Sequence, residues 1–277
     1  MQASFDFGYP WWLSYGHLPL IALAGGLLAL GFWRKWPKWR MVICGTFAVW
    51  SLAAFLVTRF ALDINQPPPL PTQRFLQSDT GRVLDLGAGT GRSSVMVLTA
   101  RPHATLVALD LFGESFDQHF GKNDAPQQRL MQNLKAAGVD RRVTIQTADM
   151  RTLPFEGASF DAIVSAYAID HLNRKGIEQS LAEAARVVKP GGDILLMLVG
   201  KEPWVLFAFG PVLMHAGGIR NTEWWTAQLE KAGFQIIETG TRPATLYLLA
   251  RRSAGTVPQP GYSSTSTRNR EPSGPPR

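Results

Sequence analysis

The segment VLDLGAGTGR, residues 83–92, constrains the fold of this 277-residue chain more than any other stretch. Four residues typical of a buried strand run into Gly87, Gly89 and Gly91, and the RSSVMVLTA that follows is typical of a helix. Glycine lets a backbone turn sharply and come close to a ligand. The free N–H groups at the start of the helix point to the same place. The segment therefore predicts a strand, turn and helix that bind a nucleotide-like ligand.

The spacing of these glycines argues against a dinucleotide. A dinucleotide site has the pattern G-x-G-x-x-G, whereas here it is G-x-G-x-G, with Arg92 where the third glycine of that pattern would fall. Asp85, in the strand, would repel a pyrophosphate but suits a ligand with a cationic amino group. The loop taken alone is also compatible with a tight strand-to-helix turn that binds nothing.

Strand-like runs alternate with helix-like segments over the central part of the chain. The runs are 82–86, 105–110, 142–147, 160–166, 193–199, 234–238 and 244–250. This alternation predicts an α/β fold, with a mostly parallel sheet and helices on both faces. Only a few residues join the last two runs, so we expect them to form an antiparallel hairpin at one edge.

Polar residues follow the predicted strands at positions useful to an adenosine group. Asp110 ends the second strand, nineteen residues after Gly91, where an acid can accept both ribose hydroxyls. Asp149 comes just after the third strand, where it can accept from an adenine amino group. All these groups are expected at the carboxyl edge of the sheet.

With five such segments in this order, residues 75–250 resemble the class I S-adenosylmethionine-dependent methyltransferases, especially the type 11 and ubiquinone/menaquinone-biosynthesis branch. The resemblance implies a Rossmann-like seven-stranded sheet with an antiparallel last strand, and S-adenosylmethionine as cofactor. It does not define the acceptor. The cofactor-binding residues it implies are Asp85, Gly87, Ala88, Gly89, Gly91, Asp110, Leu111, Asp149, Met150 and Ser165, with Ala166 lining the crevice beside Ser165.

Three residues after the fourth strand are candidates for catalysis. A sulfonium methyl group is already electrophilic, so a methyltransferase mainly aligns the acceptor and excludes water. A base is needed only when the acceptor must lose a proton. Tyr167, Asp170 and His171 are the candidates. Asp170 is equally compatible with a helix cap, and His171 with a purely structural histidine.

Two inserted segments are expected to close an acceptor pocket. They are residues 112–126, which contain His119, and residues 201–225, which contain His215 and many large apolar side chains. An apolar lid suits an apolar acceptor, a lid that touches a bilayer, or an ordinary core under a long loop. The sequence has no tight His, Cys or carboxylate cluster, so we expect no metal site.

The amino-terminal region is typical of a membrane segment. Residues 10–33 and 41–58 contain no charged residue, and about 20 apolar residues cross a bilayer. Tryptophans flank the runs, as they do at lipid headgroups. We predict a hairpin of two transmembrane helices over residues 1–62; a buried pair of helices in a soluble protein is the alternative.

Composition shifts divide the rest of the chain. A Pro-rich linker covers residues 63–72, because successive prolines cannot continue a helix. The methyltransferase domain follows over residues 73–252. Residues 253–277 are rich in Ser, Thr, Pro and Gly and are predicted to be disordered.

The placement of charge excludes one class of partner. The formal net charge is +7, but four positive charges lie in the loop RKWPKWR and a net three lie after residue 251, so the domain is balanced. This argues against nucleic acid as a partner. The one cysteine, Cys44, lies in an apolar run, which excludes an intrachain disulfide.

The combined features predict a methyltransferase anchored in the inner membrane, with a cytoplasmic catalytic domain and a lipid- or quinone-like acceptor. The positive-inside rule would place the basic loop in the cytoplasm instead, so either that loop is external or the hairpin lies in one leaflet. The alternatives are a membrane-protein acceptor, a transferase of aminopropyl groups, or a cofactor-binding regulator without turnover. The oligomeric state is not predicted.

Overall fold

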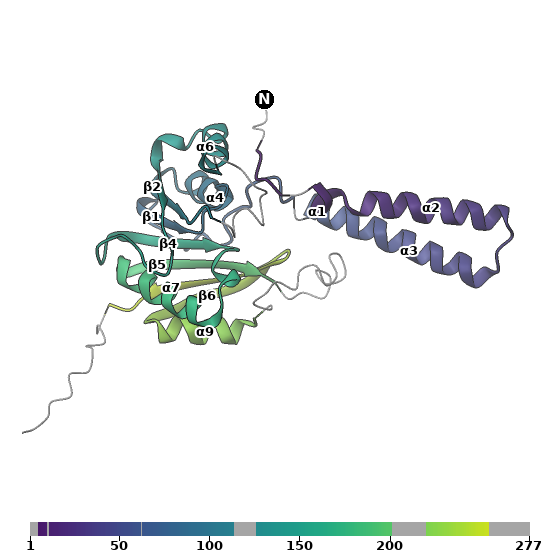
Figure 1. The fold of residues 1–277 in the computed structure, drawn as a ribbon. Coiled ribbons are helices and arrows are strands. Elements are labelled where there is room, and N and C mark those ends of the chain that lie inside the picture. Colours follow the sequence, from purple (N-terminus) through teal and green to yellow (C-terminus); the bar gives the residue numbers. More distant parts are fainter. Residues whose placement is uncertain (1–4, 10, 62, 114–125, 201–219, 255–277) are drawn as a thin grey trace, which may run out of the picture.

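The structure, a computed structural model, describes residues 5–9, 11–61, 63–113, 126–200 and 220–254. These residues form a helical hairpin and an α/β domain (Figure 1). The tail predicted to be disordered falls almost wholly outside the described residues. So do His119, His215 and most of the two inserted segments that were expected to close the acceptor pocket.

One sheet of seven strands forms the centre of the domain, in the order β3-β2-β1-β4-β5-β7-β6. Its strands are β1 (Thr80–Leu86), β2 (His103–Asp110), β3 (Val143–Thr147), β4 (Phe160–Ala166), β5 (Val188–Val199), β6 (Phe234–Arg242) and β7 (Thr245–Arg252). Strands β1 to β5 pair in parallel, whereas β7 is antiparallel to both β5 and β6. The mixed seven-stranded sheet with its edge hairpin is therefore confirmed.

Helices cover both faces of this sheet (Figure 1). They are α4 (Arg92–Ala100), α6 (Pro126–Ala136), α7 (Arg174–Val187) and α9 (Thr222–Lys231), with short 3₁₀ turns η2 (Asp140–Arg142) and η3 (Ile169–His171). Successive residues of a strand point to opposite faces. Val83 packs in the core under α4 and α6, while Leu84 packs in the core under α7 and α9, and both are fully buried. Burial on both faces explains why the strand reads as continuously apolar.

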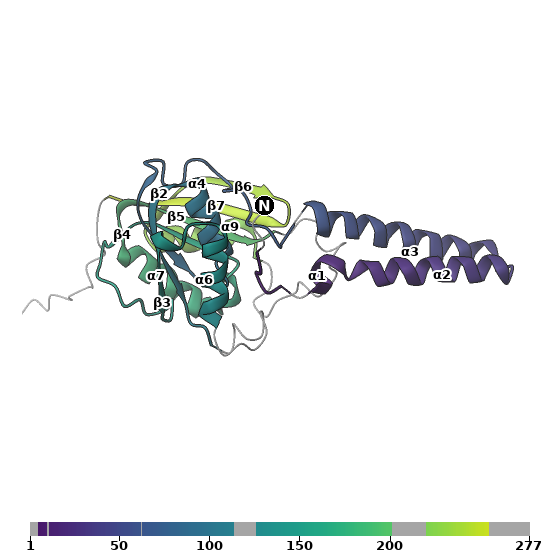
Figure 2. The ribbon, with the colours of Figure 1, turned by 90° about the horizontal axis from the view of Figure 1, so that it is seen from above.

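The amino-terminal helices form a hairpin that projects away from the domain (Figures 1 and 2). They are α1 (Trp11–Tyr15), α2 (His17–Trp33), α3 (Lys38–Leu56) and the π-helical turn η1 (Val57–Ala61). Helices α2 and α3 pack side by side, yet many large apolar side chains face outward. Phe32 is 84% exposed and Val49 69% exposed.

The expectation of two membrane-spanning helices is not supported. Among the described residues, one helix, Lys38–Phe60, is long and apolar enough to cross a membrane. The first apolar run forms two helices, α1 and α2, which are separated at Gly16. Only the 17 residues of α2 remain beyond the break, about 25 Å of helix against a hydrocarbon core of about 30 Å.

A short segment ahead of the hairpin packs on the domain. Phe7 is buried, and its carbonyl accepts a hydrogen bond from Thr90 Oγ1 (3.0 Å). The N–H of Asp6 donates to Asn133 Oδ1 (2.9 Å), and Asn133 Nδ2 donates back to the carbonyl of Asp6 (2.8 Å). The hairpin is therefore tied to the domain at both of its ends, through residues 5–9 and through the linker.

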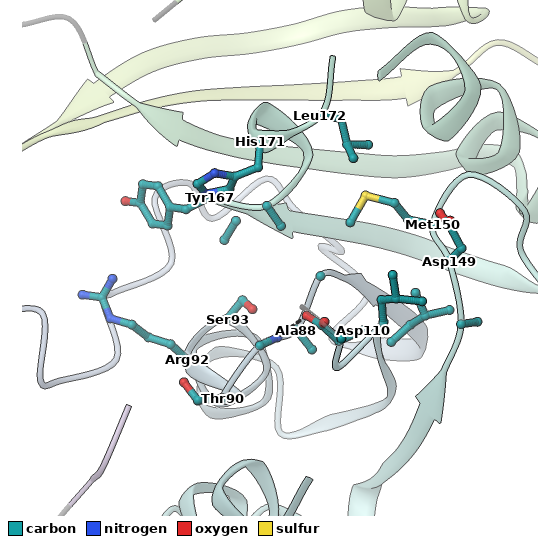
Figure 3. A pocket seen from close by; sticks show the side chains of 18 of the residues that line it. Ala88, Thr90, Arg92, Ser93, Asp110, Asp149, Met150, Tyr167, His171 and Leu172 are labelled. Atoms are coloured by element: carbon teal, nitrogen blue, oxygen red, sulfur yellow. Dashed lines mark hydrogen bonds between the residues drawn. The ribbon is translucent and has the colours of Figure 1, made fainter. Parts of the chain in front are cut away.

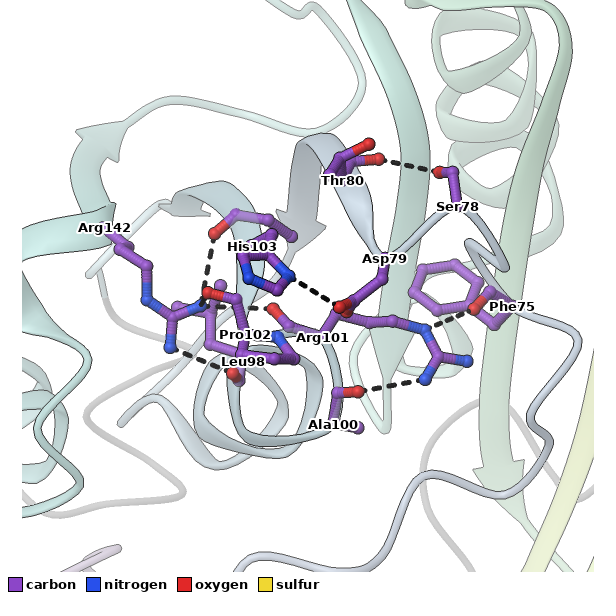
Figure 4. Close-up of polar contacts among 11 residues, drawn as sticks. Phe75, Ser78, Asp79, Thr80, Leu98, Ala100, Arg101, Pro102, His103 and Arg142 are labelled. Atoms are coloured by element: carbon purple, nitrogen blue, oxygen red, sulfur yellow. Dashed lines mark hydrogen bonds and ion pairs between the residues drawn. The ribbon is translucent and has the colours of Figure 1, made fainter.

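The amino ends of the strands are held by two arginines (Figure 4). Arg142 donates to the carbonyls of Leu98 (2.9 Å), Arg101 (3.1 Å) and Pro102 (2.9 Å), which lie at the carboxyl end of α4. The side chain of Arg101 is buried and its Nε donates to the carbonyl of Phe75 (2.9 Å). Helix ends leave carbonyls without intrahelical partners, and these guanidinium groups supply the missing donors.

Candidate functional site

The glycine loop joins β1 to α4 and fits closely under neighbouring residues. Gly87 and Gly91 have φ angles of +79° and +90°, a conformation that favours glycine. A Cβ at Gly87 would collide with Ala168, and one at Gly91 with Leu130. Glycine is thus required at both positions, by backbone conformation and by space. The bare backbone leaves room for a ligand to lie against the loop.

Asp110, at the end of β2, holds this loop in place. Its Oδ2 accepts from the N–H of Gly89 (2.8 Å) and its Oδ1 from the N–H of Phe112 (3.1 Å). The loop is also fixed by N–H bonds from Gly87 and Ala88 to the carbonyl of Leu109 (2.8 and 3.0 Å). A carboxylate has about four acceptor positions, so Asp110 can bind ligand hydroxyls while it holds the loop.

A cavity of about 220 Å³ opens beside the loop at the carboxyl ends of β1, β2 and β4 (Figure 3). It brings together most of the predicted site residues: Gly87, Ala88, Gly89, Asp110, Leu111, Asp149, Met150, Tyr167 and His171. Predicted residues that do not line it are Asp85, Gly91, Ser165 and Asp170. Its lining combines the carboxylates of Asp110 and Asp149 with apolar side chains such as Met150.

Several residues that line the cavity were not predicted from the sequence. They include Tyr9, Pro68, Thr90, Arg92, Ser93 and Met96. The helix start after the glycines was a usable indication for Thr90 and Ser93, because such N–H groups face ligands. No local pattern points to Tyr9 or Pro68, which reach the cavity from the segments on either side of the hairpin.

Asp85 lies behind the cavity and is fully buried. Its Oδ2 accepts from Ser93 Oγ (2.7 Å) and Ser94 Oγ (2.6 Å), while its Oδ1 has no hydrogen-bond partner among the described residues. Burial raises its pKa to about 6, although the two serine hydrogen bonds oppose the rise and the charge of Asp110 adds to it. Contact with a ligand therefore has to pass through Ser93, so the methionine-binding role of Asp85 stays a prediction.

Asp149 is held by its neighbour Arg151. Arg151 donates to both carboxylate oxygens, from Nε to Oδ1 (2.9 Å) and from Nη2 to Oδ2 (2.5 Å). These hydrogen bonds keep the pKa of Asp149 below its ordinary value. Asp149 and Met150 lie at the far side of the cavity from Arg92 and Tyr167 in Figure 3. In this conformation the carboxylate is bound to Arg151, so acceptance from an adenine amino group stays a prediction.

Tyr167 follows β4 in a left-handed backbone conformation, with φ of +52°. A non-glycine residue there is unusual, and such residues cluster at functional sites. Its N–H donates to the carbonyl of Met197 (2.8 Å), and its hydroxyl is hydrogen bonded to Thr245 Oγ1. Burial raises the pKa of the phenol. Tyr167 is thus fixed at the cavity wall and stays neutral at physiological pH.

The other two catalytic candidates differ in position. His171 lines the cavity, whereas Asp170 does not. Both lie in η3. The cap of α7 is Asn173, whose Oδ1 accepts from the N–H of Gly176 (2.8 Å), so Asp170 is not the cap of that helix. Ser165 is buried and donates to the carbonyl of Leu86 (2.9 Å), which makes it a tie between β4 and β1.

The fold and the cavity are typical of a domain that binds a nucleotide-like ligand. Comparison with known proteins indicates which kind of domain this is. Residues 83–192 match the methyltransferase domain family. An O-methyltransferase family protein from Burkholderia thailandensis has a similar fold, with a TM-score of 0.54 and 18% identity over 88% of this chain and 70% of that one. Residues 83–192 are therefore similar to a methyltransferase domain, and the fold agrees with that similarity.

Two curated relatives are similar to part of the chain. The ubiquinone/menaquinone biosynthesis C-methyltransferase of Geotalea daltonii is 30% identical over 46% of this chain and 49% of its own length. The demethylmenaquinone methyltransferase of Clavibacter sepedonicus is 38% identical over 44% of this chain and 42% of its own length. The chain thus spans less than half the length of these relatives.

Proposed function

We propose that this protein is a membrane-anchored methyltransferase whose acceptor is an apolar, quinone-like small molecule. The observation that carries the proposal is the cavity where the glycine loop and Asp110 meet Tyr167 and His171. The acceptor class is supported by the names of the curated relatives, which refer to ubiquinone and menaquinone biosynthesis and to demethylmenaquinone. Membrane anchoring is supported by the exposed apolar side chains of α2 and α3.

The residues of the cavity fit S-adenosylmethionine. Gly87, Ala88 and Gly89 line the cavity mainly with backbone atoms, and we expect Asp110 to accept from the ribose hydroxyls. Met150 offers an apolar contact for adenine. When bound, the cofactor supplies a sulfonium methyl group that needs no further activation.

The remaining steps fall to the acceptor and to the chain's own residues. The acceptor atom bonds to the methyl carbon as the carbon–sulfur bond breaks, the electron pair of that bond stays on sulfur, and the acceptor loses one proton. Tyr167 and His171 flank the cavity, where they orient the acceptor and exclude water. The imidazole of His171 is the group that can take the proton.

The hairpin is the proposed membrane anchor. Residues 5–9 and the linker both contact the domain, so both ends of the hairpin lie on the side of the domain. The tip then carries Arg34 and Arg40 over the rings of Trp33 and Trp39, with 5.4 and 5.2 Å from guanidinium carbon to ring centroid. Basic and aromatic side chains together suit a headgroup layer. We propose that the catalytic domain faces the cytoplasm, where its cofactor is made.

Methyl transfer tests the catalytic part of the proposal. Full-length protein in detergent is incubated with labelled S-adenosylmethionine and a demethylated naphthoquinol. Transfer of label by the wild type, absent for Asp110→Ala, supports the proposal. Cofactor binding without transfer supports a non-catalytic regulator instead, and label found only on membrane proteins supports a protein acceptor.

Membrane association is tested by introducing one positive charge on the face of α3 that we expect to contact lipid. Val49 lies in the middle of α3 and is 69% exposed, and an arginine at that position in a bilayer costs roughly 3 kcal/mol. Val49→Arg is therefore expected to release the protein from carbonate-washed membranes. The matched control is Thr152→Arg, an exposed position of the domain, which should leave the distribution unchanged. Equal membrane fractions for both variants would contradict the anchor.

A further inference from the structure

A second cavity, of about 410 Å³, lies where the hairpin joins the domain. Its apolar wall is formed by Leu13, Ile64, Met197, Val199, Pro243 and Ala244. These residues come from α1, the linker, the end of β5 and the turn between β6 and β7. The wall is therefore assembled from the anchor and the domain together, and no single element of either part contains it.

The two cavities share part of their lining. Tyr9, Pro68, Arg92 and Tyr167 belong to both. In Figure 3, Arg92 and Tyr167 lie together on one side of the cofactor cavity, and Asp149 lies on the other. A ligand in the second cavity would thus approach from the side opposite the proposed adenine position. This is the direction from which a methyl acceptor has to come, because donor and acceptor must meet in line.

Two arginines that line the second cavity are held by the linker backbone, and the acid Asp63 also lines it. Arg92 Nε donates to the carbonyl of Gln66 (2.9 Å), and Arg242 Nη2 donates to the carbonyl of Pro71 (2.9 Å). A guanidinium carries five N–H donors, so one bond to the linker orients each group without using its full capacity. Two fixed cations in an apolar chamber suit a ligand with ring oxygens and a hydrocarbon body.

The position of the chamber connects it to the anchor. Asn65 Nδ2 donates to Ser14 Oγ (3.2 Å), which ties the linker to α1. Arg59 in η1 and Asp63 at the start of the linker form an ion pair (3.5 Å). Leu13 and Asp63 line the chamber within a few residues of α2 and η1. When the hairpin is in a bilayer, the mouth of the chamber lies at the bilayer surface.

We propose that this chamber is the acceptor site and that it takes a lipophilic quinol, with the ring oxygens at Arg92 and Arg242 and the hydrocarbon chain directed past Leu13 toward the hairpin. This rests on the proposed function and adds to it a location and an entry route. Tyr167 is then the positioning residue at the junction of donor and acceptor. The acceptor reaches the cofactor without crossing water, because the anchor delivers it from the lipid phase.

Filling the chamber is the sharpest test. Ala244 lies in the turn between β6 and β7 with φ of +57°, so a larger side chain there intrudes on the chamber from a turn. Ala158 has φ of +56°, is exposed and lies just ahead of β4 at the amino end of the sheet. Ala158→Phe is thus a control with the same backbone conformation and the same added volume.

The probe is a naphthoquinone that carries two isoprene units, measured by quenching of tryptophan fluorescence with full-length protein at fixed detergent concentration. Ala244→Phe is expected to weaken its binding about tenfold or more, while the affinity for S-adenosylmethionine changes less than about twofold. Ala158→Phe should leave both affinities at the wild-type value. Undiminished naphthoquinone binding by Ala244→Phe, or no binding by the wild type, overturns the proposal. An equal loss of both ligands also overturns it, because the chamber would then belong to the cofactor site.

A second measurement does not depend on a variant. The same naphthoquinone with a diazirine at the end of its chain is photolysed with the wild type, and labelled peptides are identified by mass spectrometry. Label within residues 9–13, 63–71 or 242–245 is expected, and label confined to α7 or α9 overturns the proposal. Both measurements concern binding alone. If the protein binds the naphthoquinone as expected but transfers no methyl group, the proposed function is rejected and the proposed binding site is retained.

Discussion

The two ends of the sheet differ in what their polar side chains are available to bind. At the amino end, Arg101 and Arg142 donate to main-chain carbonyls, and α4 is fastened to the neighbouring loops (Figure 4). At the carboxyl end, Gly87 and Tyr167 hold left-handed conformations, and Asp85 buries an oxygen that has no partner among the described residues. Both ends contain non-glycine residues with positive φ, such as Asp79 at the amino end, so backbone strain does not separate them. What separates them is the cavity, which opens at the carboxyl end and gives a ligand room to bind.

The largest expected effect is a loss of cofactor affinity, and it compares one carboxylate at each end of the sheet. Asp110→Ala should reduce the affinity for S-adenosylmethionine about 100-fold, since hydrogen bonds to a charged group contribute roughly 3 kcal/mol. It removes the proposed ribose acceptor and the bond to Gly89 N. Isothermal titration calorimetry on the full-length protein measures the change.

Asp161 gives the matched control at the amino end. It also accepts from a backbone N–H, that of Arg82 (2.8 Å), and from Lys189 Nζ (2.6 Å). Asp161→Ala should lower stability and leave cofactor affinity unchanged. If both variants lost affinity alike, the division of roles between the two ends would be wrong.

The second effect concerns the pH dependence of stability at Asp85. Burial raises its pKa to about 6 in the folded state, against 3.8 as the ordinary value. Between these values the folded state binds more protons than the unfolded state, so the free energy of unfolding falls as pH rises. The total loss is about 3 kcal/mol from below pH 4 to above pH 6. Asp85→Asn removes it.

Urea unfolding between pH 4 and pH 8 tests this effect. The advantage of Asp85→Asn over the wild type should grow through the window from about 4 to about 6 and stay constant above it. Parallel pH profiles for the two proteins would show that Asp85 is not strained. A bound cofactor that contacts Asp85 through Ser93 should stabilise the charged carboxylate. It should therefore reduce the difference in the free energy of unfolding between Asp85→Asn and the wild type.

The sequence predicted the local parts of the site and missed the parts that depend on distant contacts. The glycine loop, Asp110 and Met150 lie in patterns of a few residues, and all line the cavity or hold it. Tyr9 and Pro68 reach it only because the chain returns to the domain on both sides of the hairpin. The prediction of two membrane-spanning helices was not supported, because hydropathy does not register the interruption at Gly16 between α1 and α2.

The assignment of polar residues by position was similarly limited. Asp149 falls at the predicted edge of the cavity, but its carboxylate pairs with Arg151. The sequence is compatible with Asp170 as a helix cap or as a catalytic residue, whereas the cap of α7 is Asn173. Which partner a side chain selects depends on geometry within a few ångströms, and a linear pattern does not carry that information.

The third prediction tests the amino end directly. Arg142 donates to four main-chain carbonyls: those of Leu98, Arg101, Pro102 and Ala104. Arg142→Ala leaves these groups without their donor and should destabilise the domain by about 2 kcal/mol. Chemical denaturation measures the loss. Affinity for S-adenosylmethionine should stay within about twofold of the wild type, because the change lies at the opposite end of the sheet from the cavity.

The smallest expected effect lies at the edge of the cavity, in the pair of Asp149 and Arg151. The pair is partly exposed, with 27% and 47% of the two side chains accessible, and such pairs contribute at most about 1 kcal/mol. If Asp149 accepts from the adenine amino group, Arg151 competes with the ligand for the same oxygens. Arg151→Ala should then raise affinity for S-adenosylmethionine by up to about threefold, while Asp149→Ala lowers it. Calorimetry on both variants decides the role: a loss of affinity for Arg151→Ala equal to that of Asp149→Ala would mean that the ion pair itself forms the adenine site, and that this corner of the carboxyl end is as firmly paired as the amino end.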